Sequence, residues 1–364
     1  MQDPTLQTLH GEQNDADVQG AEYFMKNEIP ALISQYSPKD IYNCDETALY
    51  YRATTYKTLC FKDERAVGSK NSKERVTVLV ATNMDCSDKR QLLVIGKSHR
   101  PRCFRGANVS LEYHANANAL MTGDIFEQWL RAFDGNMRSE NRCILLLLDN
   151  CTAHEKLTNL TNIKLQYLPA NTTSPIQPLD QGIIKNLKAY YRHEQCTQLL
   201  SLMDIERSET NKPTMGSLAR KISLLEARSM VTDAWIAVKN ETIQNCFKKG
   251  EFRKPDELHI AIRPLEVVCA PVGIRQSDFD DLVELQAENK CVPKATDQDR
   301  VDGIRQAFAV EMADQDTEDD EPITKKELLE TIRNLERIAA LGWDSEEILK
   351  VRDVIRANMA ASHK

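Results

Sequence analysis

The chain has 364 residues, of which 41% are hydrophobic and 28% charged, and its net charge is −8. This is the composition of an ordinary globular protein, and the length accommodates two or three domains. No apolar run approaches the roughly 20 residues that cross a bilayer, so we expect no membrane segment. The first residues are polar and give no reason to expect a secretory signal.

The ten cysteines are scattered along the chain, and no Cys-x-x-Cys pair occurs. Because no secretory signal is expected, we predict reduced thiols inside a cell. Cys151 and His154 are three positions apart, but no second pair lies near them in sequence, which argues against a structural zinc site.

Charge is distributed unevenly along the chain. Residues 41–200 hold 21 Lys and Arg against 16 Asp and Glu, whereas residues 278–321 hold 4 against 15. The acidity therefore belongs to a separate segment. The central region is mildly basic and remains compatible with a nucleic-acid partner.

The first part of the chain predicts a short lead-in followed by strands. Residues 1–40 are largely polar, with one weakly amphipathic helix before a turn. The predicted strands lie at residues 41–51, 58–61, 75–82 and 91–95, where aromatic and aliphatic residues are separated by turn residues. Their succession predicts an antiparallel meander. Asp45 lies in the middle of the first strand, where an acid is either solvated or directed inward.

The middle of the chain predicts helices alternating with strands. A helix from Thr122 to Phe133 has its apolar residues on one face. The strand 142–150 contains five consecutive apolar residues and ends at Asp149, so we expect it to be covered on both faces. The strand 163–168 alternates, which indicates an edge or half-covered position. A long helix then begins at Pro178, with Asp180 in its first turn, and helices continue to about residue 247.

The last third of the chain predicts two further regions. Residues 251–322 are acidic and irregular, which is typical of a disordered linker. Residues 323–362 predict a pair of amphipathic helices, with apolar positions at Leu328, Leu329, Ile332, Leu335, Ile338, Ile348, Val351 and Ile355. This pair either closes on itself as a helical hairpin or presents its stripe to a protein partner or a second copy.

Two basic stretches, Lys97–Arg105 and Lys62–Lys73, are candidates for phosphate contacts. An ordinary solvated loop can have the same composition, so both interpretations remain open. Because no recognition helix is predicted beside them, any binding to DNA is expected to be weak and without sequence preference.

Three acids lie where carboxylates could converge on one point, at Asp45, Asp149 and Asp180. Each has a simpler interpretation when taken alone, as a solvated side chain or as the cap of a turn or helix. Three carboxylates without an accompanying His or Cys pair favour a hard ion, Mg²⁺ or Mn²⁺, over zinc. Sites of this kind hold two ions and act on phosphodiesters.

Several sequence motifs occur together in a characteristic order. They are Asn43-Cys44-Asp45-Glu46-Thr47, Leu93-Val94-Ile95-Gly96-Lys97-Ser98, Pro101-Arg102-Cys103-Phe104, Leu145-Leu146-Leu147-Leu148-Asp149-Asn150-Cys151, Leu168-Pro169 with Asn171-Thr172-Thr173-Ser174, and Gln177-Pro178-Leu179-Asp180-Gln181-Gly182. Over about residues 41–200 the chain resembles the pogo/Tigger/jerky group of the DDE transposase superfamily. The separation of Asp149 and Asp180 is also similar to that of the group.

The resemblance implies an α/β fold, an RNase H-like mixed sheet flanked by helices, spanning residues 41–250. It places Asp45 on the first strand, Asp149 on the fourth and Asp180 at a helix start. By the resemblance all three are catalytic and hold two Mg²⁺ or Mn²⁺ ions, with Asp45 bridging them. Asn150, His154 and Glu46 match neighbouring motif positions and are expected to support these ligands.

The chain departs from the group in several places. Cys44 and Thr152 stand where the group more often has Ala and Pro, and Ala48 stands where it often has Gly. None of these changes removes a carboxylate. Members of the group usually carry two helix-turn-helix units ahead of the catalytic domain, and only about 40 residues precede Asp45 here, so we expect that module to be missing or truncated.

Two classes of function remain open from the sequence, besides a decayed transposon fragment that has no present role. The first is an enzyme, a DNA-binding transposase-derived endonuclease that cleaves and transfers strands with two metal ions. The second is a domesticated nuclear protein that keeps the fold and binds nucleic acid or partners without catalysis. The complete set of three acids favours the first, and the short front and the acidic segment favour the second. In either case the resemblance implies DNA as the partner and the nucleus as the location.

Overall fold

The computed structural model describes residues 18–54, 72, 74–106, 112–151, 153–154, 157–169, 176–206, 213–253 and 262–287. The chain divides into two compact units, Met1–His99 with Gly106–Ala295, and Arg100–Arg105 with Thr296–Lys364. In the second unit the described residues include one short 3-10 helix, η2 (Arg102–Phe104). All other elements below belong to the first unit.

A six-stranded sheet forms the centre of the first unit. Its strands are β1 (Ile41–Leu49), β2 (Val76–Asn83), β3 (Leu93–Gly96), β4 (Glu112–Ala115), β5 (Ile144–Leu148) and β6 (Ile163–Tyr167). They lie in the order β4-β3-β2-β1-β5-β6. β2 is antiparallel to both β1 and β3, whereas β4 is parallel to β3, β5 to β1 and β6 to β5. The succession of β1, β2 and β3 confirms this part of the predicted meander, and β6 lies at an edge of the sheet as predicted.

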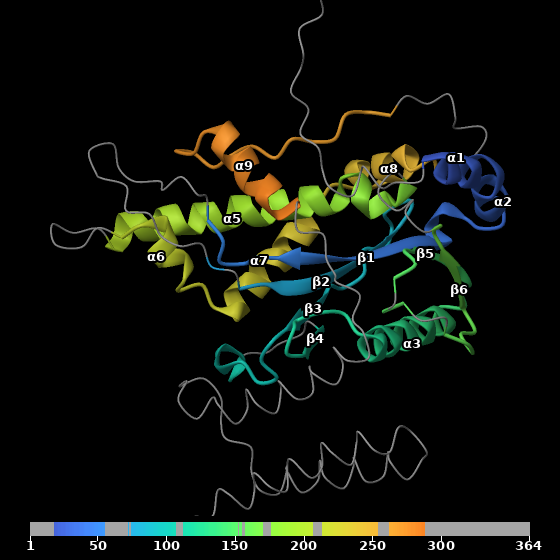
Figure 1. Cartoon of the computed structure of the whole chain (residues 1–364), viewed down its shortest axis with the longest axis horizontal. Coiled ribbons are helices and arrows are strands. Elements are labelled where there is room, and N and C mark those ends of the chain that lie inside the picture. Colours follow the sequence, from blue (N-terminus) through green and yellow to red (C-terminus); the bar gives the residue numbers. More distant parts are fainter. Residues whose placement is uncertain are drawn as a thin grey trace, which may run out of the picture. The chain divides into compact units, whose positions relative to one another are not determined.

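Helices cover both faces of the sheet (Figure 1). The α-helices are α1 (Val18–Asn27), α2 (Ile29–Ile33), α3 (Gly123–Ser139), α5 (Ile183–Glu206), α6 (Met215–Ala219), α7 (Leu224–Ala237), α8 (Asn240–Lys249) and α9 (Gln276–Ala287), and η1 (Pro38–Asp40) and η3 (Pro178–Gln181) are 3-10 helices. Figure 1 shows α5, α7 and α8 on one face and α3 on the other. The RNase H-like mixed sheet with flanking helices is therefore confirmed.

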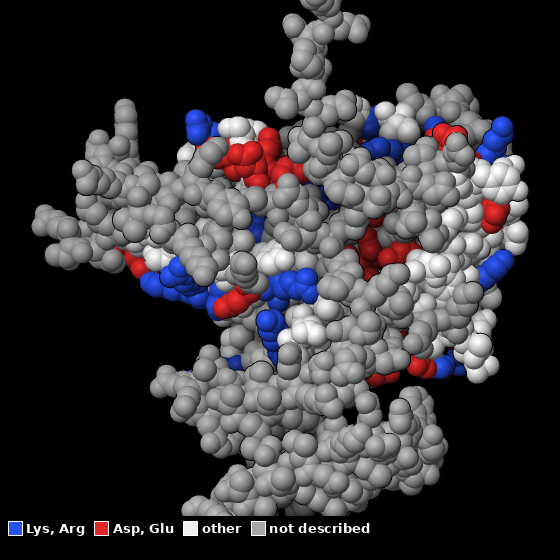
Figure 2. Space-filling view, viewed as in Figure 1, with Lys and Arg blue, Asp and Glu red and all other residues white. Residues whose placement is uncertain are grey.

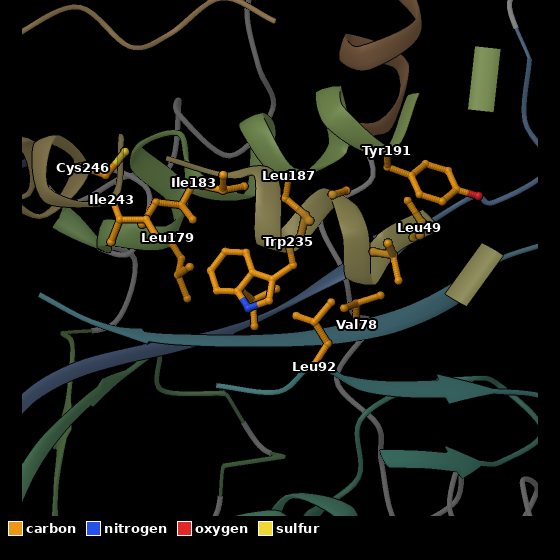
Figure 3. Close-up of a cluster of buried hydrophobic side chains, with 14 of the residues drawn as sticks. Leu49, Val78, Leu92, Leu179, Ile183, Leu187, Tyr191, Trp235, Ile243 and Cys246 are labelled. Atoms are coloured by element: carbon orange, nitrogen blue, oxygen red, sulfur yellow. The ribbon is translucent and has the colours of Figure 1, made fainter. Parts of the chain in front are cut away.

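The alternation of side chains along β1 and β5 separates two cores. Ile41, Leu49, Leu145 and Leu147 belong to the core beneath α5, α7 and α8. Figure 3 shows this core, with Leu179, Ile183, Leu187 and Tyr191 meeting Leu49 and Val78 of the sheet and Trp235 of α7. Tyr42, Cys44, Leu146 and Leu148 belong to the second core, beneath α3. Since β5 contributes side chains to both cores, its unbroken apolar run results from cover on both faces, as predicted.

Helix α3 has the amphipathic pattern that its sequence predicts. The Thr122 side chain caps it by accepting a hydrogen bond from the Ile125 backbone N–H at 3.4 Å. Phe126, Trp129 and Phe133 are buried against the sheet, and Tyr42 meets the Phe133 ring edge-on at 5.3 Å between centroids. The helix therefore closes the second core.

Helix α5 is fixed to the exit of β1 by buried polar groups. Arg192 is fully buried and donates hydrogen bonds to the backbone carbonyls of Tyr50 at 2.6 Å and Ala53 at 2.8 Å. Tyr191 and Gln195 both donate to the carbonyl of Tyr51, at 2.9 and 2.7 Å. Because a buried guanidinium must find acceptors, these contacts hold the helix in one place along the strand.

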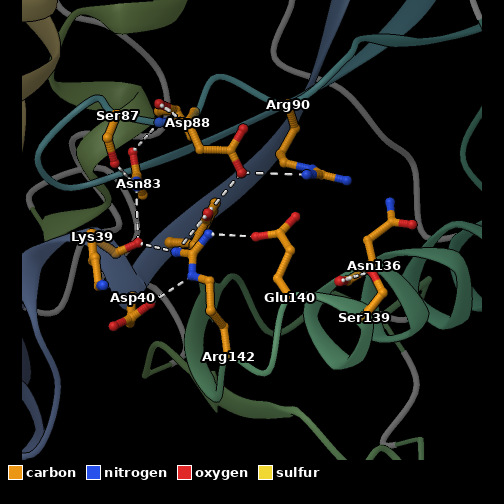
Figure 4. A network of polar contacts seen from close by, with 12 residues as sticks. Lys39, Asp40, Asn83, Ser87, Asp88, Arg90, Asn136, Ser139, Glu140 and Arg142 are labelled. Carbon is orange, nitrogen blue, oxygen red and sulfur yellow. Dashed lines mark hydrogen bonds and ion pairs between the residues drawn. The ribbon is translucent and has the colours of Figure 1, made fainter.

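The starts of β1 and β5 are joined by Arg142 (Figure 4). Its guanidinium donates to Asp40 at 2.9 Å, to the carbonyl of Lys39 at 2.6 Å and to the Tyr42 hydroxyl at 3.1 Å. The Tyr42 hydroxyl in turn donates to Asp88 at 2.7 Å. Arg142 thus links the starts of β1 and β5, and the Tyr42 hydroxyl connects it to Asp88 in the turn after β2.

Two predicted regions differ from the structure. The expected lead-in contributes Phe24, Ile29 and Ile33 to the main core, so its described part is not separate from the domain. The expected linker 251–322 contains α9, whose Phe279 and Val283 are buried, so that part is not a linker. The cause is an apolar stripe at helical spacing within an acidic sequence, which a count of charges does not detect.

Other expectations lie outside the described residues. They include the strand at 58–61, the rest of the linker beyond residue 287 and the C-terminal helical pair at 323–362. Strand β4, by contrast, was not predicted. Among the described helices, none is both long and apolar enough to span a membrane.

We predict that Asp134→Asn destabilises the fold. Asp134 of α3 is 2% exposed, and its Oδ1 accepts hydrogen bonds from the backbone N–H groups of Thr161, Asn162 and Ile163 at 3.1, 2.7 and 3.1 Å. Weakening this anchor should lower the free energy of unfolding by about 1–3 kcal/mol, measured by urea denaturation. Arg138→Gln removes the contacts to Asp134 and to Thr161 Oγ1 from an arginine that is 62% exposed, and should change the free energy of unfolding by less than about 1 kcal/mol.

The Asp134 contribution should depend on pH with a defined sign. Burial acts to raise the pKa of Asp134, but hydrogen bonds from Asn162, Arg138 and Thr161 outweigh it and lower the pKa. A depressed carboxyl pKa stabilises the fold above the ordinary value of about 4, and the contribution is lost as pH falls through the folded-state pKa. The stability difference between wild type and Asp134→Asn should therefore be constant near neutrality and shrink in acid. A difference that grows in acid would contradict this account.

Candidate metal centre

Asp45 and Asp149 lie on neighbouring parallel strands. Backbone pairing aligns Ile41 with Leu145 and Asn43 with Leu147, so two further positions along each chain reach Asp45 and Asp149. Side chains two positions apart on a strand share a face. Asp45 therefore lies on the face of Ile41, which is the face beneath α5, and Asp149 directly follows the end of β5.

A buried amide connects this strand pair to the segment that carries Asp180. Asn43 is 0% exposed, and its Nδ2 donates to the carbonyl of Leu147 at 2.9 Å. Its Oδ1 accepts from the backbone N–H of Leu179 at 2.9 Å. The residue just before Asp180 is thus bonded to β1, two positions from Asp45.

Asp180 lies in the 3-10 helix η3, one turn ahead of α5. The predicted long helix therefore begins after this acid, at Ile183. The break falls at Gly182, whose φ is +142° and where an added Cβ would lie 2.3 Å from Leu265 Cδ1. Only glycine fits this position without displacing Leu265, which keeps η3 a separate turn.

His154 lies between two carboxylates. Its side chain is 0% exposed, with Nε2 3.0 Å from Glu46 Oε1 and Nδ1 2.6 Å from Asp149 Oδ1. The ring also packs on Phe126, with 4.2 Å between centroids. Glu46 comes from the face of β1 opposite Asp45, so the histidine joins the α3 side of the sheet to the end of β5.

The pKa values of the pair follow from this geometry. Burial acts to lower the pKa of His154, but the carboxylates of Glu46 and Asp149 and the thiol of Cys151 raise it well above its ordinary value. Burial acts to raise the pKa of Asp149, but its contacts with His154 and Cys151 lower it. These contacts therefore favour the protonated form of His154 and the ionised form of Asp149.

The donor atoms fit a cation. Asp45, Asp149 and Asp180 are each half-buried, so their carboxylates are neither sealed in the core nor fully solvated. Asp149 Oδ1 is buried and meets no hydrogen-bond donor at a suitable angle among the described residues, despite the short distance to His154. A buried acceptor that lacks a well-aligned donor is suited to a metal ion. Figure 2 shows acidic side chains in a recess over the region where Figure 1 labels β1 and β5.

The sequence and the structure differ on the supporting residues. The structure brings His154 and Glu46 to Asp149, whereas Asn150 is exposed. Asn43 was part of a motif but had no expected role, and its position in a strand gives no signal that it faces inward. Asp149 follows the fifth strand, not the fourth, because β4 precedes it.

The basic stretch Lys97–Arg105 is exposed at its charged positions. Lys97, Arg100, Arg102 and Arg105 all lie at the surface. Of the second stretch, Lys62–Lys73, only Ser72 lies within the described residues. The charged side chains of the first stretch therefore lie at the surface, as an ordinary solvated loop and a phosphate-contacting loop both require.

Comparisons with known proteins show which family and which proteins the chain is similar to. Residues 73–247 match the model described as "DDE superfamily endonuclease", so Asp149 and Asp180 lie within the match and Asp45 precedes it. The mouse protein "Tigger transposable element-derived protein 4" is 36% identical over 231 residues, which are 63% of this chain and 43% of that protein. "CENP-B homolog protein 2" of Schizosaccharomyces pombe is 33% identical over 269 residues, which are 68% of this chain and 50% of that protein.

The chain thus matches half or less of the length of these two relatives. Among solved structures, the crystal structure of the Mos1 mariner paired end complex with Mn overlaps with a TM-score of 0.39 and 13% identity, over 73% of this chain and 68% of that chain.

We predict that Asn43→Ala disturbs both the fold and the candidate metal centre. The substitution leaves the buried N–H of Leu179 and carbonyl of Leu147 without their partner, which should cost about 1–3 kcal/mol for each group in urea denaturation. Because η3 is then no longer tied to β1, binding of Mn²⁺ should weaken as well. Thr47→Val changes another buried polar residue on the same strand and should leave Mn²⁺ binding unchanged.

Proposed function

We propose that this chain, which belongs to the pogo/Tigger type of DDE superfamily endonuclease, binds DNA and cleaves its phosphodiester backbone with divalent metal ions held by Asp45, Asp149 and Asp180. One observation carries the proposal, namely that the side chain of Asn43 bonds to both Leu147 and Leu179. Asp45 lies two positions after Asn43, Asp149 two positions after Leu147, and Asp180 one position after Leu179. The acids thus come from three elements that one side chain joins.

The chemistry of the ligands selects the ion. Carboxylate oxygens are the ligands that Mg²⁺ and Mn²⁺ prefer. When bound, a pair of such ions activates a water nucleophile and stabilises the leaving oxygen of a phosphodiester. The proposed roles of the three acids are therefore to hold the ions and, through them, to orient the scissile phosphate.

His154 and Glu46 keep Asp149 in the ionised form and in position. Asp149 must be ionised to bind a metal, and its contact with His154 favours that form. Glu46 holds the far nitrogen of His154 at 3.0 Å, which fixes the ring against Asp149. Glu46 and His154 are therefore positioning residues, since each acts on the metal through Asp149.

DNA is the proposed partner and the nucleus the proposed location. Among similar proteins, one is named for a transposable element and another, "ARS-binding protein 1" of S. pombe, is 30% identical over 269 residues. The exposed arginines at 100, 102 and 105 supply charges that could meet phosphates. Nucleic-acid binding without cleavage is the competing function, and the experiments below separate the two.

We predict that Asp45→Asn, Asp149→Asn and Asp180→Asn each abolish Mn²⁺-dependent nicking of supercoiled plasmid. Each variant should also lose the rise in melting temperature that Mn²⁺ gives the wild type, because an ion that binds only the folded state stabilises it. At an ion concentration about 100 times the dissociation constant this stabilisation is about 2.7 kcal/mol. Asp124→Asn changes an exposed acid of α3 and serves as the matched control.

The results distinguish the two functions. Nicking by the wild type and by Asp124→Asn, but by none of the three variants, would support the enzyme. A wild type that binds DNA without cleaving it, in either Mg²⁺ or Mn²⁺, would support the competing function. Nicking that survives all three substitutions would rule out this set of ligands.

We predict that the triple substitution Arg100→Gln, Arg102→Gln and Arg105→Gln weakens binding to DNA of any sequence. Each phosphate contact that is lost should reduce the slope of log affinity against log salt by about 1, as measured by fluorescence anisotropy over a salt series. Arg131→Gln changes an exposed arginine of α3 and is the control. An unchanged slope in the triple variant would show that this stretch is an ordinary solvated loop.

A further inference from the structure

A second set of metal-binding atoms lies beside the proposed ion site. A carboxylate oxygen of Asp149, Sγ of Cys151 and a ring nitrogen of His154 all lie within 4.8 Å of one another. The three side chains come from one short segment after β5. Cys151 is half-buried and His154 is buried, so this is not a cluster of surface charges.

The orientation of His154 is that of a metal ligand. In metal sites the ring nitrogen that does not bind the metal usually donates its N–H to a carboxylate. Glu46 Oε1 takes this place at Nε2, 3.0 Å away. Nδ1 lies 2.6 Å from Asp149 Oδ1 and 3.3 Å from the backbone carbonyl oxygen of Asp149. The ring of His154 and the carboxylate of Asp149 are thus close enough to supply ligands to one metal ion.

The donor set differs in kind from that of the three acids. A thiolate, an imidazole and a carboxylate suit Zn²⁺ and Co²⁺, whereas Mg²⁺ takes oxygen ligands almost alone. Three protein ligands also leave the fourth position of a tetrahedral ion open to water or a phosphate. The sequence argued against zinc because no second Cys or His pair lay nearby, but a structural site with four ligands is not the only kind of zinc site.

We propose that Asp149, Cys151 and His154 bind Zn²⁺, with Glu46 orienting the histidine, in a site that shares Asp149 with the proposed Mg²⁺ or Mn²⁺ centre. Because one carboxylate serves both sites, occupation by Zn²⁺ draws Asp149 away from Asp45 and Asp180. Zinc is then an inhibitor of cleavage. Only this last step rests on the proposed function, since zinc binding itself does not require catalysis.

The binding experiment uses Co²⁺ as the probe, titrated into the full chain under reducing conditions. A thiolate ligand gives a sulfur-to-cobalt charge-transfer band in the near ultraviolet, and Zn²⁺ should displace it. Wild type and Cys143→Ser should both show the band, whereas Cys151→Ser should not. Cys143 is exposed and lies just before β5, so it is a matched control at the opposite end of the same strand.

A second variant tests the positioning role of Glu46. Glu46→Gln should keep the band but weaken Zn²⁺ binding by about 10–100-fold, the usual effect of removing a carboxylate that orients a histidine ligand. An absent band in the wild type, or an equal band in Cys151→Ser, would overturn the proposal. An unchanged affinity in a folded Glu46→Gln variant, checked by circular dichroism, would overturn the role of Glu46.

The inhibition experiment separates this proposal from the proposed function. Nicking in Mn²⁺ is measured across a Zn²⁺ series, with each variant normalised to its own rate without zinc. Cys151→Ser should need at least about tenfold more Zn²⁺ than wild type or Cys143→Ser for the same inhibition of nicking. Removing a metal ligand should weaken Zn²⁺ binding at least as much as removing Glu46, which only orients a ligand. Equal inhibition of all three would overturn the shared-ligand model. A cobalt band without any wild-type nicking would instead reject the proposed function and leave the zinc site standing.

Discussion

The side-chain amide of Asn43 is the interaction on which the candidate site depends. It is fully buried, so neither its N–H groups nor its carbonyl can bond to water, and its bonds to Leu147 and Leu179 have no replacement. These two contacts set the position of β5 and η3 relative to β1. Each of the three acids lies within two positions of Asn43, Leu147 or Leu179. The Asn43 amide therefore determines where the backbone carries each acid.

The surrounding packing makes this arrangement rigid. Arg142 fixes where β1 and β5 begin, and Arg192 fixes α5 to the backbone just after β1. Gly182 allows η3 to end and α5 to begin at once, so Asp180 stays on a turn held from both sides. A site formed by these three acids would bring like charges together, and contacts at both ends of the strands would oppose their repulsion.

The sequence predicted those parts of the fold whose signals are local. The apolar run at 144–148 and the amphipathic pattern of α3 both depend on neighbouring residues, and both elements formed as expected. The role of Asn43 could not be predicted, because its partners lie 104 and 136 positions away and a polar residue in a strand usually faces water. The same holds for Glu46, whose partner His154 lies 108 positions away. The acidic composition of residues 251–322 led to the wrong prediction of a linker where α9 buries Phe279.

The Asp149 carboxylate takes part in both of the proposed metal sites. On one side it contacts the buried ring of His154, and its side chain is 28% exposed. The contact with His154 lowers the pKa of Asp149 and so favours the ionised form that binds a metal ion. The same contact places a nitrogen and a sulfur donor next to an oxygen donor. Under the two proposals, the choice between hard and soft ions depends on whether Asp149 binds an ion together with Asp45 and Asp180 or together with His154 and Cys151.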